Sequence, residues 1–330
     1  RHLDRSGGRE REDLDRMSAA AGRGSPLLAA ILLKERTMHQ IAFVGLGSMG
    51  FPMARNLALA GFPVRGHDVR PAVLERLPAI GVTPAPTPAD AFADADFAVL
   101  MVVNAAQAES VLFAEGGLDH LKPGGIVVLM ATCPPGSVAA LAARVTAAGF
   151  GFVDAPVSGG VVGAEAASLT IMTAATAEIF EKARPVLAAM GSKVVHLGTA
   201  AGQGATAKAV NQLLCGAHIA VAAEALSLAR KLGVDMDQMF DIVAGSAASS
   251  WMLRDRGPRM LQDEPIVTSA VDIFVKDLGI VLEAGRDART ALPIAALAHQ
   301  LFLSVSGRGL GGIDDSQVIK AYDMLQGRRD

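Results

Sequence analysis

The chain has 330 residues, of which 51% are hydrophobic and 19% charged, so it is not intrinsically disordered as a whole. Its formal net charge is −3, so no basic footprint indicates binding to nucleic acid or to an anionic membrane. Two cysteines exclude a disulfide scaffold, and no CxxC pair indicates structural zinc. No uninterrupted apolar run reaches the ~18 residues that a membrane helix needs. We therefore expect a cytoplasmic α/β protein without a metal, membrane or nucleic-acid partner, long enough for two domains.

Residues 1–37 differ in composition from the rest. They begin with a charge-mixed segment without apolar periodicity, which is typical of disorder. Residues 25–36 hold a short apolar run that lacks the flanks of a signal peptide. We expect residues 1–37 to be a disordered or non-native extension, with Met38 or Met17 as the natural first residue, because a strand begins directly after Met38.

From residue 40 onwards, short apolar runs alternate with helical segments. The runs predict strands over residues 41–45, 63–68, 97–103, 125–131, 151–156, 169–174 and 193–198. Uninterrupted apolar strands between helices are typical of a parallel sheet covered on both faces. The pattern predicts a Rossmann-type dinucleotide-binding domain over residues 38–201.

After residue 204 the strand pattern stops. Residues 205–232 predict one long helix that is too apolar on all sides to face water. Further helices are expected over residues 236–243, 269–284, 293–304 and 316–325. We expect an all-α domain over residues 202–330, joined to the first by the long interdomain helix. Its extended apolar character favours a homo-oligomer, either a homodimer or a homotetramer.

The motif GLGSMG follows the first strand and opens a helix. It comprises Gly45, Leu46, Gly47, Ser48, Met49 and Gly50. In this context GxGxxG predicts a dinucleotide site, because Gly45 permits the tight turn, Gly47 admits a pyrophosphate and Gly50 lets helix and strand pack closely. The helix N-terminus adds N–H donors and the positive end of its dipole. The alternative is a glycine-rich turn without a ligand.

Asp68 closes the second strand. A carboxylate there accepts hydrogen bonds from the ribose hydroxyls of NAD and repels the 2′-phosphate of NADP, so it favours NAD. Two alternatives remain open: Asp68 caps the turn before Pro71, or Arg70 binds a phosphate.

The strand over residues 151–156 leads into the turn Ser158, Gly159 and Gly160. Successive backbone N–H groups and a hydroxyl form a nest that suits a carboxylate. An ordinary loop explains the motif equally well.

Lys208 lies in the first turns of the long apolar helix, and Asn211 and Gln212 share its face. Lysine is rarely buried without a partner or a function, and burial lowers its pKa toward neutrality. A snorkelling lysine is the alternative, although a helix N-terminus disfavours a cation. His218 lies on roughly the same face and is interpreted as a core histidine rather than a ligand of substrate.

Four other residues have simpler interpretations. Cys133 and Cys215 are expected to be small buried residues rather than nucleophiles. Lys276 and Asp277 are expected to be a self-paired surface couple.

Four segments, in this order and spacing, resemble the β-hydroxyacid dehydrogenase family: GLGSMGFPMARNLALAG, DAPVSGG, GQGATAKAVNQ and FVKDLG. The resemblance covers residues 40–322. It implies that residues 45–50 hold the pyrophosphate and that Asp68 holds the adenosine ribose. It further assigns the nicotinamide side to Val102, Val103, Thr132 and Lys276, and the substrate to Ser158, Gly159, Gly160, Lys208 and Asn211.

The resemblance implies oxidation of a small hydroxy acid with NAD, in which Lys208 is the acid/base and Asn211 orients the substrate. Gln212 departs from the family's commoner KxxNN pattern, and this argues against 3-hydroxyisobutyrate. Segments such as NQLLCGAHIAVAAEA and DDSQVIKAY resemble the members of the family that act on a sugar acid, and this resemblance implies oxidation at the C2 hydroxyl. Within enzymes of this family, the alternatives are reduction of a short aldehyde acid such as tartronate semialdehyde and oxidation of 3-hydroxyisobutyrate. A non-catalytic NAD-binding protein is the alternative from another class, and Lys208 argues against it.

Overall fold

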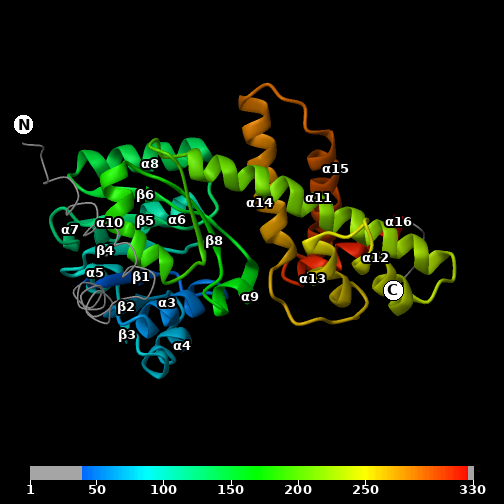
Figure 1. The fold of residues 1–330 in the computed structure, drawn as a ribbon, viewed down its shortest axis with the longest axis horizontal. Coiled ribbons are helices and arrows are strands. Elements are labelled where there is room, and N and C mark those ends of the chain that lie inside the picture. The colour runs from blue at the N-terminus through cyan, green and yellow to red at the C-terminus, as the bar shows by residue number, and fades with distance from the viewer. Residues whose placement is uncertain (1–38, 326–330) are drawn as a thin grey trace, which may run out of the picture.

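The computed structural model describes residues 39–325, so the extension expected over residues 1–37 lies outside the described residues. Figure 1 shows two parts side by side: a sheet covered by helices, and a group of helices near the C-terminus. One long helix, α11 (Gln203–Lys231), leaves the first part and runs through the second. The predicted architecture, a Rossmann-type part followed by a helical part, is confirmed.

One sheet organises the first part. Its strands are β1 (Ile41–Val44), β2 (Val64–His67), β3 (Thr83–Pro84), β4 (Phe97–Leu100), β5 (Ile126–Leu129), β6 (Gly151–Asp154), β7 (Val157–Ser158), β8 (Thr170–Ala174) and β9 (Lys193–Gly198). The order is β3-β2-β1-β4-β5-β6-β8-β7, with β9 paired to β8. The first six strands are all parallel and have the doubly wound order, whereas β8 is antiparallel to β6 and β7. The strand order reverses beside β1, and this is where such sheets bind ligands.

The remaining elements are helical. In the first part they are α3 (Gly50–Leu59), α4 (Pro71–Leu74), η1 (Leu77–Ile80), α5 (Pro88–Phe92), α6 (Ala105–Glu109), η2 (Ser110–Ala114), α7 (Gly117–His120), α8 (Pro135–Ala147), α9 (Gly160–Glu165) and α10 (Ala177–Ala188). After α11 come α12 (Met236–Gly245), α13 (Trp251–Met260), α14 (Val271–Asp287), α15 (Pro293–Val305), η3 (Ser306–Leu310), η4 (Asp315–Val318) and α16 (Ile319–Leu325).

Both faces of the sheet are buried at its central strands β1, β4 and β5. Along β1, Ile41 and Phe43 enter one apolar cluster, and Ala42 and Val44 enter another. Side chains alternate across a strand, so a strand covered on both faces has to be apolar at every position. This explains the uninterrupted apolar runs of the sequence.

The start of α11 is fixed by a side chain from the sheet. Asp154, the last residue of β6, accepts hydrogen bonds from the backbone N–H groups of Gly202 and Ala205 at 2.9 and 3.0 Å. Gly204 leaves room for this contact, because a Cβ there would lie 3.0 Å from Cγ of Asp154. The sheet therefore fixes the first turn of α11, the helix that carries Lys208.

A buried polar network supports the helical part. Arg256 on α13 donates two hydrogen bonds to the Asp315 carboxylate, at 2.9 and 2.8 Å. Arg259, one turn on, bonds Asp314 at 3.0 Å. Helix α13 was not predicted from the sequence, and Ser316, expected in the last helix, lies instead in the 3₁₀ turn η4.

Among the described residues, one helix is long and apolar enough on average to cross a membrane, namely α11. Polar residues such as Lys208 and Asn211 interrupt this helix, so it does not stand out as an uninterrupted apolar run in the sequence. More than half of the apolar window of α11 is buried against the rest of the fold, as expected of a core helix.

Candidate active site

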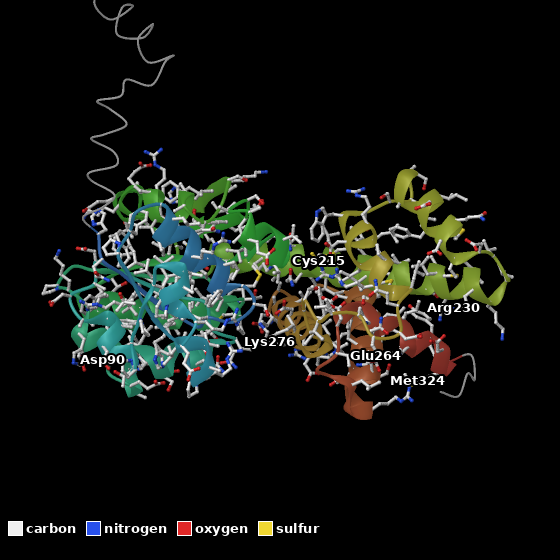
Figure 2. All side chains as sticks on the ribbon, turned by 90° about the horizontal axis from the view of Figure 1, so that it is seen from below. Asp90, Cys215, Arg230, Glu264, Lys276 and Met324 are labelled. Atoms are coloured by element: carbon white, nitrogen blue, oxygen red, sulfur yellow. The ribbon has the colours of Figure 1, made fainter. Side chains whose placement is uncertain are left out.

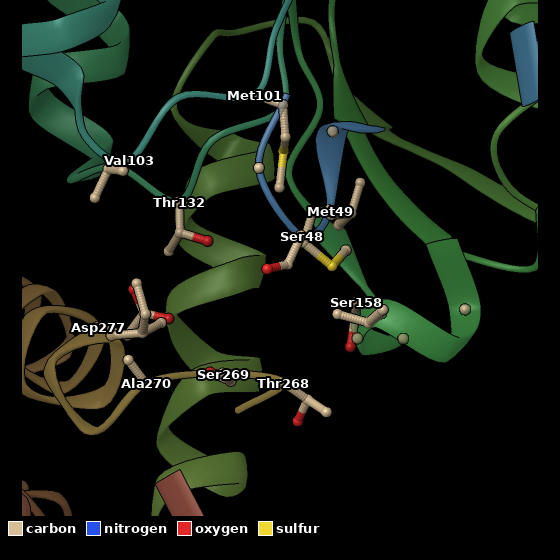
Figure 3. A pocket seen from close by; sticks show the side chains of 18 of the residues that line it. Ser48, Met49, Met101, Val103, Thr132, Ser158, Thr268, Ser269, Ala270 and Asp277 are labelled. Atoms are coloured by element: carbon tan, nitrogen blue, oxygen red, sulfur yellow. The ribbon is translucent and has the colours of Figure 1, made fainter. Parts of the chain in front are cut away.

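A cavity of about 1270 Å³ lies between the two parts of the molecule. Its walls include the carboxyl ends of β1, β2 and β4 and the faces of α11 and α14. Figure 3 shows Ser48, Val103 and Thr132 on one side of it, with Asp277 and Thr268 from the helical part opposite. Such a cavity can hold a dinucleotide together with a small substrate.

Almost every residue that the sequence singled out lines this cavity. These are Gly45, Gly47, Ser48, Met49, Gly50, Asp68, Val102, Val103, Thr132, Ser158, Gly159, Gly160, Lys208, Asn211 and Lys276. Leu46 is the exception: its backbone belongs to the glycine turn, but its side chain is buried in the core of the sheet.

The glycine turn between β1 and α3 has the geometry that its sequence predicts. Gly45 has φ +90°, and a Cβ on Gly50 would lie 1.9 Å from the carbonyl oxygen of Gly45. A Cβ on Gly47 would meet only the Arg70 guanidinium, at 3.9 Å, so the space in front of Gly47 is open. Two glycines are therefore needed by the fold, and the third leaves room for a pyrophosphate. These residues fit a bound dinucleotide.

Asp68 lies just beyond β2 and is tied to this turn. Its Oδ2 accepts a hydrogen bond from the Leu46 N–H at 2.8 Å. Arg70 donates to both carboxylate oxygens, at 2.8 and 3.0 Å. Burial would raise the pKa of Asp68, but these hydrogen bonds together lower it below its ordinary value. Asp68 is therefore ionised at neutral pH, and Arg70 is held beside it.

The Ser-Gly-Gly turn faces α11. Gly159 and Gly160 have φ +137° and +62°, and the pair opens helix α9. The Ser158 hydroxyl donates to Oδ1 of Asn211 at 3.5 Å. The turn thus brings backbone N–H groups and a hydroxyl to the helix that carries Lys208.

Lys208 is buried, with 7% of its surface exposed. Its Nζ donates to Oε1 of Gln212 at 2.7 Å. Burial lowers the pKa of Lys208 below its ordinary value, against the opposing charge of Asp277. The amine can therefore exchange a proton at a lower pH than an exposed lysine, which is what general acid/base chemistry requires.

The expectation that Lys276 and Asp277 form a surface couple is wrong. They do pair, at 2.8 Å, but only 3% of Asp277 is exposed. Lys276 also donates to the backbone oxygen of Thr132, beyond β5, at 3.0 Å. Figure 2 shows Lys276 and Cys215 at the junction of the two parts. Lys276 thus connects α14 to the loop at the carboxyl end of β5.

Several cavity residues were missed or interpreted otherwise. Asp277 and Arg256 line the cavity, and so does Trp251, for which the sequence is compatible with either a core or a pocket-wall position. His218 is partly buried and also lines the cavity, so it is not a core histidine. Cys133 and Cys215 are both buried thiols, as expected. Within residues 39–325, no group of three or more His, Cys, Asp or Glu side chains is placed to hold a metal ion.

Two family models match the chain. The NAD-binding domain of 6-phosphogluconate dehydrogenase matches residues 40–198, and the NAD-binding domain of NADP-dependent 3-hydroxyisobutyrate dehydrogenase matches residues 202–322. An L-threonate dehydrogenase from Cupriavidus necator is 46% identical, over 87% of this chain and 97% of its own length. An NAD-dependent L-serine dehydrogenase from Pseudomonas aeruginosa is 33% identical over 88% of this chain and 100% of its own length.

Solved structures agree with these matches. A 3-hydroxyisobutyrate dehydrogenase from Salmonella typhimurium superposes with a TM-score of 0.82 at 38% identity, covering 86% of this chain and 99% of that one. The fold, the cavity and these matches together define a nicotinamide-dependent dehydrogenase that acts on a CH–OH group. The chain belongs to the β-hydroxyacid dehydrogenase family, its cofactor is NAD, and its substrate is a small hydroxy acid.

Proposed function

We propose that this enzyme oxidises a small sugar acid, L-threonate, at its C2 hydroxyl, giving the 2-oxo acid. The observation that carries the proposal is the 46% identity, over nearly the full length, to a protein named L-threonate dehydrogenase. The cavity supports a polar substrate, because Asn211, His218 and Ser158 line it together with Thr268 and Ser269.

In this proposal Lys208 is the catalytic acid/base. NAD, held by residues 45–50 and Asp68, would supply the acceptor for the hydride of C2. The neutral Lys208 amine takes the proton of the C2 hydroxyl, so the carbonyl forms and the amine becomes an ammonium. In reduction the same ammonium returns the proton. The lowered pKa of Lys208 supports this role, because the amine has to be neutral before it can accept a proton.

The other predicted residues position the two ligands. Ser158, Gly159 and Gly160 bind the substrate carboxylate through the hydroxyl and the backbone N–H groups of their turn, and Asn211 orients the substrate beside Lys208. Residues 45–50 hold the pyrophosphate, and Asp68 holds the adenosine ribose. Val102, Val103, Thr132 and Lys276 line the nicotinamide side.

The test is a panel of hydroxy acids assayed with NAD, following the absorbance of the reduced cofactor. L-Threonate is expected to give a higher kcat/KM than 3-hydroxyisobutyrate or D-glycerate. Reduction of tartronate semialdehyde is measured in the reverse direction. A higher kcat/KM for 3-hydroxyisobutyrate or tartronate semialdehyde would move the enzyme to another branch of the family.

We propose a homodimer or homotetramer in the cytoplasm. Four apolar side chains on α11 are more than half exposed, at spacings of four, seven and seven residues: Val210, Leu214, Val221 and Leu228. An apolar stripe of this spacing suits a helix–helix contact between copies. The two free cysteines fit a reducing compartment. Light scattering after size exclusion measures the mass, and a monomer would contradict the oligomer.

A further inference from the structure

Gln212 stands at the centre of a buried hydrogen-bonded chain. Its Oε1 accepts from Nζ of Lys208 at 2.7 Å and from Nδ2 of Asn211 at 2.9 Å. Its Nε2 donates to Oδ2 of Asp277 at 2.6 Å. Only 6% of Gln212 is exposed, so water does not replace these bonds readily.

Chemistry fixes the orientation of the Gln212 amide. An ionised carboxylate accepts hydrogen bonds and donates none, so Asp277 has to meet the NH₂ end of the amide. The carbonyl end then faces Lys208 and Asn211, which both offer N–H donors. Asp277 thus decides which end of Gln212 faces the lysine, although the carboxylate forms no hydrogen bond to Lys208.

From this arrangement we propose that Gln212 is a positioning residue, which holds the Lys208 amine toward the cavity and keeps the Asp277 carboxylate one amide away from it. The inference rests on the proposed role of Lys208 as acid/base. It assigns to Gln212 a function in proton transfer in addition to the substrate preference that its departure from KxxNN suggests.

The spacing matters because Coulomb attraction grows as charges approach. A carboxylate in direct contact with an ammonium favours the charged amine strongly, whereas a neutral amide between them weakens that effect. Lys276 on α14 pairs with the other oxygen of Asp277 at 2.8 Å and offsets its charge further. The remaining titratable group that acts on Lys208 is the thiol of Cys215, whose own pKa burial raises. Lys208 is thus held by its hydrogen bond to Gln212 without being locked in its charged form.

The length of the side chain is also needed. Lys208 and Gln212 are four residues apart on α11, so their side chains lie on one face. Asparagine, which the commoner KxxNN pattern has at this position, is one methylene shorter. From the same backbone its amide ends nearer to α11 and farther from Asp277, which Gln212 meets at 2.6 Å.

The test uses the variants Gln212→Met and Gln212→Asn of the full-length enzyme. Methionine keeps the length and apolar volume but removes both ends of the amide. We expect kcat to fall by ~10–100-fold, because the amine is no longer oriented. We also expect the rising limb of kcat/KM against pH, in oxidation, to move to lower pH, because the ammonium loses an acceptor. Gln212→Asn should change kcat and the position of the rising limb in the same directions, but by smaller amounts.

Three controls separate this role from a structural one. Gln238→Met makes the same substitution at an exposed position of α12 and should change neither quantity. The Kd for NAD, measured by fluorescence without substrate, should stay as in the wild type in all variants. Asp277→Asn should lower kcat in the wild-type background and add little to Gln212→Met, because both act through the same amide.

A wild-type kcat and pH profile in Gln212→Met would overturn the proposal. A loss of activity without a shift in the rising limb of kcat/KM against pH would also overturn it, since that combination indicates that Gln212 only packs. If Gln212→Met does not fold, the kcat and the pH profile of Gln212→Asn test the proposal instead. The variants are assayed with whichever hydroxy acid the wild type uses best, so a wrong substrate assignment shows in the wild-type panel and leaves this test intact.

Discussion

The carboxyl group of Asp154 makes stability depend on pH in a direction opposite to that of an ordinary carboxylate. Only 1% of Asp154 is exposed, and burial raises its pKa from 3.8 to about 6, against the backbone N–H bonds that it accepts. Between these two pH values the folded protein keeps a proton that the unfolded chain has released. The contribution of Asp154 to stability is therefore present below pH ~4 and is lost as pH rises through ~6. At 1.36 kcal/mol per pKa unit, the loss amounts to about 3 kcal/mol.

Asp154→Asn removes the titration and keeps one oxygen that can accept from Gly202 and Ala205. The free energy of unfolding of the variant, minus that of the wild type, should therefore rise by up to about 3 kcal/mol between pH 4 and pH 7. Urea unfolding of both proteins at half-unit pH steps measures this difference, in which the other carboxylates cancel. Asp154→Ala is the control: it removes the acceptor and should destabilise the protein at every pH. A difference that stays flat or falls over this range would refute the reasoning.

Two further predictions concern the cofactor site. Asp68→Ser should raise kcat/KM with NADP relative to NAD, because the carboxylate that repels a 2′-phosphate is gone; a wild type that already prefers NADP would make Arg70 the better candidate. Gly50→Ala should lower the unfolding midpoint, because its Cβ would clash with the Gly45 carbonyl, whereas Gly47→Ala should fold normally and raise the Kd for NAD. Thermal unfolding and NAD titration of both variants check this contrast, and equal unfolding midpoints would contradict it.

The sequence predicts most of the sheet and the dinucleotide turn because both depend on local patterns. The apolar runs of β1 and β4 to β6, and the glycine spacing after β1, follow from burial on both faces and from the close approach of helix and strand. Lys208 could also be singled out, since a lysine within an apolar helix is conspicuous on its own.

What the sequence missed depends on contacts between distant residues. Helix α13 contains Gly257 and Pro258 among charged residues, so it lacks apolar periodicity; Arg256 on it is instead neutralised by Asp315, 59 positions away. Asp277 follows a lysine, which is typical of an exposed pair, and only the packing of α14 on α11 buries it beside Gln212. Asp154 belonged to a recognised motif, but its capping role requires the position of α11.

The turnover of Lys208→Ala is the most direct test of Lys208 as the proton-transfer residue. Loss of a general acid/base reduces the rate by ~10²–10⁴-fold, and the Kd for NAD should stay close to that of the wild type because the glycine turn belongs to the other part of the molecule. Lys208→Arg should fail as well, since a guanidinium does not deprotonate near neutral pH. We expect this loss of kcat with NAD binding intact. A Lys208→Ala enzyme with near-wild-type kcat would contradict the assignment of the proton-transfer residue and the mechanism built on it.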